Sequence, residues 1–133
     1  MDEDKILILL DAAKKAMENA YAPYSRFTVG AALMAENGEI FTGCNVENAS
    51  YGASVCAERT ALLKAVSQGK RDFFAIAVIS SGGDYTLPCG ICRQVMLEFC
   101  SGDFLLVCAN CGGEYKEYKL KELIPHGFRL NQA

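Results

Sequence analysis

The sequence predicts an α/β fold, a three-layer α-β-α sandwich around one mixed five-stranded sheet. Helix-like and strand-like segments alternate in the order α-β-β-α-β-α-β-β, with a final turn of helix. Two runs, 73–80 and 104–108, are almost entirely apolar, as is typical of strands covered on both faces. Helices on both faces of a single sheet fit this order. With 133 residues, we expect one domain spanning 1–133.

The first part of the chain predicts a helix followed by a hairpin. Apolar residues recur at helical spacing over 4–20 and form one buried stripe. We expect Pro23 to end this helix, because proline disfavours the helical conformation in the residue before it. Strands are expected over 27–35 and 39–44, and the Asn-Gly pair between them favours a tight hairpin turn.

The remainder of the chain alternates helices with strands. Gly69 directly follows a helical pattern and should cap that helix, because glycine readily adopts the left-handed conformation found after helices. A Gly-Gly pair allows the turn into the last strand. The expected helices cover 55–68, 90–100 and 121–124, and the expected strands cover 73–80, 104–108 and 114–119.

Composition argues against several classes of protein. Hydrophobic residues make up 51% of the chain and charged residues 22%, which excludes a disordered chain. The net charge is −3 and the basic residues are scattered, whereas nucleic-acid binders carry a basic patch. No apolar run reaches membrane-spanning length, and the acidic start MDEDK does not resemble a signal peptide. We therefore expect a soluble cytoplasmic protein without a nucleic-acid or membrane partner.

Seven cysteines and a single histidine, His126, limit the metal chemistry available to the chain. Cytosolic thiols stay reduced, so metal binding or catalysis explains these cysteines better than disulfides do. With one histidine, any zinc site must consist mainly of thiolates.

Two short stretches, SVCAERTA and PCGICRQ, place cysteines at predicted helix starts. Cys89 and Cys92 have the usual two-residue gap between metal ligands, and Cys56 would be a third ligand. The partial positive charge of a helix N-terminus favours the thiolate form that zinc binds. Three protein ligands leave the fourth position for water, as in catalytic zinc sites. Glu58, two residues after Cys56, could then handle the proton of that water.

These motifs resemble those of the zinc-dependent nucleoside and nucleobase deaminases, whose signature is H-x-E…P-C-x-x-C with cysteine allowed in place of histidine. Together, YAPYSRFTVGAAL, NVENASYG, CAERTA and PCGICRQVMLEFC narrow the resemblance to the small homotetrameric cytidine deaminases. The resemblance covers nearly the whole chain. It implies a cytidine deaminase-like fold, one Zn²⁺ per chain, and hydrolysis of cytidine and deoxycytidine to uridine and deoxyuridine in pyrimidine salvage. It also implies a homotetramer whose active sites are completed by neighbouring subunits.

The resemblance further implies roles for the residues around the metal. Cys56, Cys89 and Cys92 would bind zinc as thiolates. Glu58 would take the proton of the water and pass it to the pyrimidine ring and the departing amine. Arg59 would donate hydrogen bonds to the ligand sulfurs and offset the negative charge of three thiolates.

A second set of residues would bind the nucleoside. Residues two apart on a strand share a face, so an amide and a carboxylate at such positions can hold a ribose hydroxyl together. The family uses Asn45 and Glu47 in this way. The aromatic members of the set would stack on the pyrimidine or close the site of a neighbouring subunit. The full set is Phe27 for stacking, Asn45 and Glu47 for the ribose, Ala57 beside the substrate, and Tyr51 and Phe128 for closure.

Two alternatives remain open. Cys89, Cys92, Cys108 and Cys111 fit the C-x₂-C-x₁₅-C-x₂-C spacing of structural zinc, which would make the chain a zinc-ribbon binding module. That interpretation leaves SVCAERTA and NVEN unexplained, and Cys108 closes an apolar strand in which its side chain should pack. Deaminases of the antibiotic blasticidin share the zinc motifs, so a modified cytosine nucleoside is the other candidate substrate.

Overall fold

One mixed five-stranded sheet forms the centre of the protein in a computed structural model that describes residues 1–130. The strand order is β2-β1-β3-β4-β5. The β3–β4 pair is parallel and the other three pairs are antiparallel, as expected for a mixed sheet. The strands are β1 (Val29–Ala35), β2 (Ile40–Cys44), β3 (Phe73–Ser80), β4 (Leu105–Ala109) and β5 (Tyr115–Lys119).

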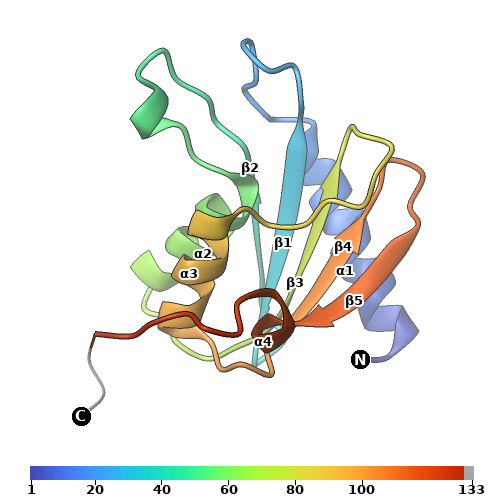
Figure 1. Ribbon diagram of the computed structural model, residues 1–133. Coiled ribbons are helices and arrows are strands. Elements are labelled where there is room, and N and C mark those ends of the chain that lie inside the picture. Colours follow the sequence, from blue (N-terminus) through green and yellow to red (C-terminus); the bar gives the residue numbers. More distant parts are fainter. Residues whose placement is uncertain (131–133) are drawn as a thin grey trace.

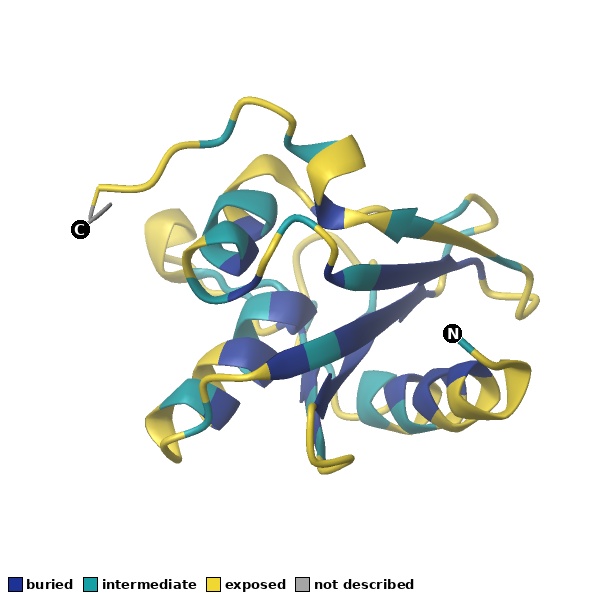
Figure 2. Ribbon diagram, turned by 90° about the horizontal axis from the view of Figure 1, so that it is seen from below, coloured by how far each residue is buried: buried dark blue, intermediate teal, exposed yellow. Residues whose placement is uncertain are grey.

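Helices cover both faces of this sheet, which confirms the predicted three-layer sandwich (Figures 1 and 2). Helix α1 (Glu3–Met17) lies on one face, and α2 (Ala57–Ser67) and α3 (Gly90–Phe99) lie side by side on the other. A short helix, α4 (Leu120–Leu123), directly follows β5. The N-terminal ends of α2 and α3 therefore lie on the same side of the sheet.

The central strands are buried on both faces. All seven residues of β1 are buried, and their side chains alternate between two cores. Ala31 and Leu33 belong to the core beneath α2 and α3, whereas Ala32 and Met34 belong to the core beneath α1. Figure 2 shows the same burial along the middle of the sheet. The near-continuous apolar pattern of these strands thus follows from their cover of helices on both sides.

Two strand glycines allow the helices to approach the sheet closely. A Cβ atom on Gly30 would lie 1.9 Å from the carbonyl oxygen of Ala13 in α1. On the other face, a Cβ atom on Gly43 would lie 2.5 Å from the backbone nitrogen of Ala61 and 2.7 Å from the carbonyl oxygen of Ala57. These distances exclude any larger residue without a backbone shift. Gly43 therefore sets how closely α2, and the motif at its first turn, lies against the sheet.

Most predicted elements are confirmed within one or two residues. All three predicted glycine turns occur, with φ of +90° at Gly38, +89° at Gly69 and +86° at Gly113. The first helix is the main boundary error, because it ends at Met17 rather than at residue 20. Beyond it, the Tyr21 N–H donates to the Asn45 carbonyl at 2.9 Å. Because Tyr21 pairs with a distant segment, the helix ends several residues before Pro23.

Two further differences lie around the first hairpin. The first strand begins at Val29 rather than at residue 27, because residues 24–28 form a loop held by side chains. A short 3₁₀ helix, Tyr51–Ala53, was not predicted. A hydrogen bond from the Ala53 N–H to the Ser50 carbonyl, 2.8 Å long, stabilises this single turn. One turn is too short to produce a periodic pattern of apolar residues, so the sequence carries no sign of it.

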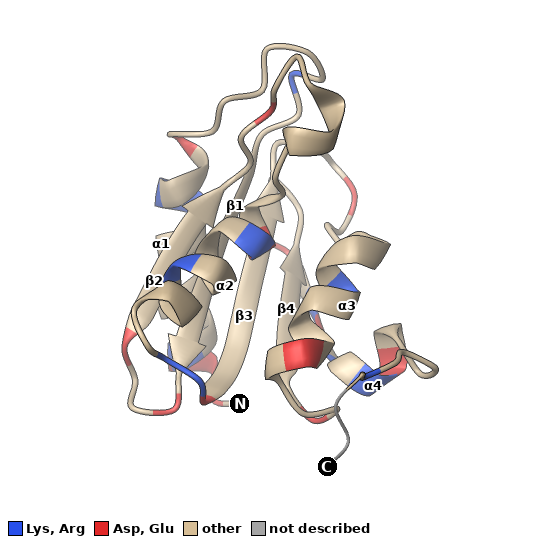
Figure 3. Ribbon diagram, turned by 90° about the vertical axis from the view of Figure 1, so that its left-hand side faces the viewer, with Lys and Arg blue, Asp and Glu red and all other residues tan. Residues whose placement is uncertain are grey.

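Most charged residues are exposed in loops, on the outer faces of helices and along β5, whereas Glu58 in α2 is buried. In the view of Figure 3, basic and acidic positions are interspersed. Over residues 1–130, no helix has both the length and the apolar character needed to cross a bilayer.

Candidate active site

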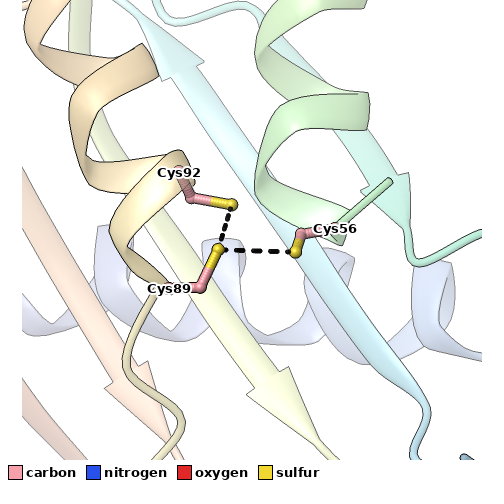
Figure 4. Close-up of side chains that lie close together, drawn as sticks. All are labelled: Cys56, Cys89 and Cys92. Carbon is pink, nitrogen blue, oxygen red and sulfur yellow. Dashed lines mark hydrogen bonds between the residues drawn. The ribbon is translucent and has the colours of Figure 1, made fainter. Parts of the chain in front are cut away.

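Three cysteine side chains meet where α2 and α3 begin. Cys56 is the N-cap residue of α2, Cys89 is the N-cap residue of α3, and Cys92 lies in the first turn of α3. The Sγ atoms of Cys56 and Cys89 are 3.7 Å apart, and those of Cys89 and Cys92 are 3.4 Å apart. Figure 4 shows the three sulfurs turned toward one another. The sheet thus brings together two motifs that are 33 residues apart in sequence.

The spacing of these sulfurs fits a single zinc ion. A Zn–S bond of about 2.3 Å in tetrahedral geometry separates neighbouring sulfurs by roughly 3.8 Å. All three ligand atoms lie within 4.8 Å of one another. Three thiolates are also a donor set that zinc prefers, and they leave one tetrahedral position for water.

The four-cysteine alternative is not what the fold assembles. Within residues 1–130, the group able to hold a metal combines Cys56 with Cys89 and Cys92, and no second such group occurs. Cys108 is fully buried in β4 and packs in the core, as expected. Cys111 is exposed in the turn after that strand. The zinc-ribbon interpretation is therefore wrong.

The cluster favours a thiolate at Cys56. The pKa of this thiol is lowered to about 5, chiefly by a hydrogen bond with the Cys92 thiol and further by Arg59. The Arg59 Nη2 lies 3.5 Å from the Cys56 Sγ, so the guanidinium reaches the sulfur as predicted. The pKa of Cys92 is raised, because this thiol keeps its proton in the bond to Cys56 and is buried.

Glu58 lies in the first turn of α2 and is only 4% exposed. Burial raises the pKa of its carboxyl group from 4.5 to about 7, because an ionised carboxylate loses its hydration there. The nearby Cys56 thiolate adds to this effect by repulsion. A carboxyl group with a pKa near neutrality can both accept and donate a proton, which suits general acid–base catalysis.

A pocket of about 250 Å³ opens onto this cluster. A larger hollow of about 490 Å³, between Leu97 and Arg129, contains none of the clustered cysteines, so size alone does not identify the site. The smaller pocket collects residues from the loop before β1 and its first residue, the segment after β2, the start of α2 and the loop before α3. It is lined by Ser25, Phe27, Val29, Asn45, Glu47, Cys56, Ala57, Glu58, Thr86, Leu87 and Cys89.

Asn45 and Glu47 hold the segment that carries Phe27. The Asn45 side chain accepts a hydrogen bond from the Val29 N–H at 2.9 Å and donates to the Phe27 carbonyl at 2.7 Å. Glu47 accepts from residues 24 and 25. Hydrogen bonding from Ser25 lowers the pKa of the Glu47 carboxyl group. Phe27, 43% exposed, is thereby presented at the wall of the pocket.

Two predicted site residues do not reach the pocket of their own chain. Tyr51 is 82% exposed and Phe128 is 63% exposed, and neither lines it. Phe128 is positioned by a hydrogen bond from the Gln94 Nε2 to its carbonyl oxygen at 2.7 Å. Ala57, in contrast, is fully buried and lines the pocket as predicted.

The predicted site residues did not include all of the pocket lining, and Ser25, Thr86 and Leu87 were left out. Each of them stands close in sequence to a motif that had been recognised. Ser25 stands in the YAPYSRF stretch, two residues before Phe27, and the other two directly precede Pro88 of the second cysteine motif.

Comparisons with known proteins agree with this geometry. Residues 4–119 match the model of the cytidine and deoxycytidylate deaminase zinc-binding region. The chain is 48% identical over 128 residues to a cytidine deaminase of Sporosarcina psychrophila, covering 96% of this chain and 92% of that protein. It is 50% identical over 121 residues to one of Halalkalibacterium halodurans, covering 91% and 92%.

A solved structure gives the same result. The crystal structure of cytidine deaminase from Burkholderia pseudomallei superposes with a TM-score of 0.89 at 47% identity, covering 96% of this chain and all of that chain.

A more distant relative by sequence is a blasticidin-S deaminase of Bacillus cereus, which is 30% identical over 133 residues, covering 94% of this chain and 93% of that protein. Taken with the three clustered thiols and the buried carboxyl group beside them, these matches mean that the chain belongs to the cytidine and deoxycytidylate deaminase family.

Proposed function

We propose that this protein catalyses the hydrolytic deamination of cytidine and deoxycytidine, yielding uridine or deoxyuridine and ammonia, as a step of pyrimidine salvage. The observation that carries the proposal is the position of Glu58, a buried carboxyl group with a pKa of about 7, at a pocket that also exposes the cysteine cluster. A metal site that was only structural would not need such a group.

The chain supplies the metal ligands and the proton carrier. Zn²⁺ held by Cys56, Cys89 and Cys92 would lower the pKa of a water molecule from 15.7 to about 7 and so provide the nucleophile. Glu58 would accept one proton from this water as the water oxygen bonds to C4 of the cytosine ring. The same carboxyl group would deliver this proton to N3. It would then take the proton of the new C4 hydroxyl group and pass it to the amino group, so that the C4–N bond breaks, ammonia leaves and C4 becomes a carbonyl. The products balance cytidine plus water.

The remaining pocket residues hold the nucleoside. Phe27 stacks on the pyrimidine, and Asn45 and Glu47 accept or donate hydrogen bonds at the ribose. The lowered pKa of Glu47 keeps this carboxylate ionised, so it acts as an acceptor for a ribose hydroxyl. Ala57 forms part of the wall beside the ring. In this proposal, Phe27, Asn45, Glu47 and Ala57 bind the nucleoside, whereas Glu58 and the three cysteines serve the chemistry.

The active unit is proposed to be a homotetramer of single-domain chains, each spanning residues 1–133. Tyr51 and Phe128 are too exposed for core packing, and in this assembly each would close the site of a neighbouring subunit. The seven free cysteines suit a reducing compartment, so we place the enzyme in the cytoplasm. Its partners are the nucleoside and other copies of the chain.

A modified cytosine nucleoside is the second candidate substrate, because a blasticidin-S deaminase is among the similar proteins. Cytidine is favoured for two reasons. Identity to the cytidine deaminases is near 50%, against 30% to the blasticidin-S enzyme. In addition, Asn45 and Glu47 together offer both a donor and acceptors to ribose hydroxyls.

The deciding experiment measures ammonia release and bound zinc in the same samples of purified protein, with cytidine, deoxycytidine and blasticidin S as substrates. The matched variants are Cys56→Ala and Cys111→Ala. We expect about one zinc per chain and cytidine deamination, both lost with Cys56→Ala and both kept with Cys111→Ala. Zinc without turnover of either cytosine nucleoside would refute the proposed activity, and turnover of blasticidin S alone would establish the second candidate.

A further inference from the structure

The hydroxyl group of Ser25 lies between two groups assigned to nucleoside binding. Its Oγ donates a hydrogen bond to the Glu47 Oε2 and accepts one from the Phe27 N–H at 3.0 Å. The other carboxylate oxygen of Glu47 accepts from the backbone N–H groups of Tyr24 at 3.0 Å and Ser25 at 3.1 Å. One side chain therefore joins the ribose-binding carboxylate to the backbone of the stacking residue.

The backbone between these groups is in a conformation that needs support. Arg26, directly between Ser25 and Phe27, has φ of +59°, the left-handed region that residues with a Cβ atom seldom adopt. Such a conformation persists only where surrounding contacts hold it. The Arg26 N–H donates to the Ala22 carbonyl at 2.9 Å, and the Phe27 carbonyl accepts from Asn45 at 2.7 Å. The Ser25 hydroxyl completes this set of contacts at the Phe27 N–H.

We propose that Ser25 is a positioning residue for nucleoside binding, acting through Glu47 and Phe27, an inference that rests on the deaminase function proposed above. Oε1 of Glu47 already accepts two backbone hydrogen bonds. The Ser25 hydroxyl holds Oε2 in one orientation, and Glu47 lines the pocket in which the ribose would bind. Without the hydroxyl, the carboxylate can rotate about its last bond and the Phe27 N–H loses its acceptor. Ribose and base recognition both weaken.

This role predicts a change in KM more than in kcat. Ser25 lines the pocket but is not part of the cysteine cluster, and the proton carrier Glu58 lies in a different element, α2. Loss of Ser25 should thus weaken binding of substrate and transition state alike, which raises KM and leaves kcat nearly unchanged. Hydrogen bonds to charged groups are among the stronger ones, so an increase in KM of about tenfold is expected.

The experiment compares Ser25→Ala with two controls. Ser25→Thr keeps a hydroxyl group at the same position and should keep KM within about threefold of the wild-type value, on the expectation that a retained hydrogen bond retains most of its effect. Ser81→Ala removes a hydroxyl that accepts from the Thr28 N–H at 3.1 Å, one residue from Phe27, without contacting Glu47. Ser81→Ala should therefore change KM much less than Ser25→Ala does. Melting temperature and zinc content are recorded for each variant.

Two further experiments test whether Ser25 acts through Glu47. In a Glu47→Gln background, Ser25→Ala should add less than its effect in the wild type, because residues that act together are not additive. With 2′,3′-dideoxycytidine, which lacks the 2′- and 3′-hydroxyl groups of the ribose, the Ser25→Ala penalty in KM should be smaller than with cytidine. Equal penalties on both substrates would mean that Ser25 does not act through the ribose.

The outcomes separate this proposal from the proposed function. If the wild-type enzyme deaminates cytidine and Ser25→Ala leaves KM unchanged, or lowers kcat instead, the positioning role is refuted while the deaminase assignment stands. If Ser81→Ala matches Ser25→Ala, the effect is general loosening of the loop and the proposal is also refuted. If the wild-type protein deaminates no cytosine nucleoside, both proposals fail together.

Discussion

The guanidinium of Arg59 points back at the thiol of Cys56, three residues earlier, with 3.5 Å between Nη2 and Sγ. This contact raises the pKa of Arg59, so the side chain is permanently charged at the edge of the cysteine cluster. Its Nε is buried and has no hydrogen-bond partner among the described residues. Arg59 is therefore oriented by the sulfur rather than by a conventional acceptor, as expected for a group that offsets thiolate charge.

Replacing Arg59 with glutamine should move the acidic limb of the pH–rate profile to higher pH. Three thiolates on Zn²⁺ carry a formal charge of −1, and the loss of a nearby cation makes it harder to remove a proton from the site. We expect kcat at pH 7 to fall, with zinc content retained and a lesser effect for Arg59→Lys. An Arg59→Gln enzyme with full zinc and an unshifted profile would contradict this role.

The zinc-free protein should react selectively at Cys56. Because the pKa of this thiol is lowered to about 5, it is mainly thiolate at pH 6, and the thiolate is the reactive form. Iodoacetamide at pH 6 should label Cys56 faster than the exposed Cys111, and the rate should fall only as the pH drops through about 5. Peptide mapping by mass spectrometry measures both sites, with zinc-loaded protein as the protected control. Faster labelling of Cys111 would rule the thiolate out.

Glu58→Gln should abolish catalysis while leaving the zinc site intact. Removing a general acid–base group typically costs about 10²- to 10⁴-fold in rate. Because the group able to hold the metal consists of the three cysteines and does not include Glu58, the variant should retain its zinc. Glu58→Asp keeps a carboxyl group and serves as the control for proton transfer. Activity of Glu58→Gln within tenfold of the wild type would exclude Glu58 as the proton carrier.

The same substitution should stabilise the zinc-free protein at alkaline pH. The folded-state pKa of Glu58 is raised from 4.5 to about 7, so the folded protein binds this proton more tightly than the unfolded chain does. Stability is therefore lost as the pH rises from about 4.5 to 7, by roughly 3 kcal/mol for this shift. Urea unfolding at pH 8 should show Glu58→Gln more stable than the wild type, with little difference at pH 4.5. The reverse order at pH 8 would contradict the burial argument.

Glu47→Ala should raise KM for cytidine. The carboxylate accepts hydrogen bonds from Tyr24 and Ser25 and, on our proposal, from the ribose as well. Steady-state kinetics with cytidine measure the effect, and Glu39→Ala, at an exposed carboxylate outside the pocket, is the matched control. If Glu47→Ala leaves KM and kcat for cytidine unchanged, Glu47 does not bind the ribose.

Shared active sites predict that inactive variants complement each other. If Phe128 closes the site of a neighbouring subunit, chains with Phe128→Ala and chains with Cys56→Ala should regain activity when mixed after unfolding and refolding. Some mixed assemblies would then combine an intact metal site with an intact Phe128. Gel filtration supplies the oligomeric state of the same samples. A monomeric elution volume, or a mixture no more active than its components, would contradict the shared site.

The sequence by itself predicted the layered architecture with good accuracy, because each element carried a local signal. Helical period, two buried apolar runs and the turn glycines are set by neighbouring residues in the chain. The end of α1 at Met17 was missed because it depends on the pairing of Tyr21 with Asn45, a contact between residues far apart in sequence. The 3₁₀ helix at Tyr51–Ala53 was missed because a single turn has no period to detect.

The three cysteines that could hold zinc, and Glu58 beside them, were predicted from the sequence, because the chemistry of the metal restricts the types and spacing of such residues. Whether Cys92 joins Cys56 or Cys108 was decided only by the fold, which seats Cys108 in the core of β4 and brings the starts of α2 and α3 together. Burial likewise determines the pKa of Glu58. The Ser25 link between Glu47 and Phe27 depends on tertiary structure for the same reason: it joins side chains across 22 residues through hydrogen-bond geometry, which no local pattern encodes.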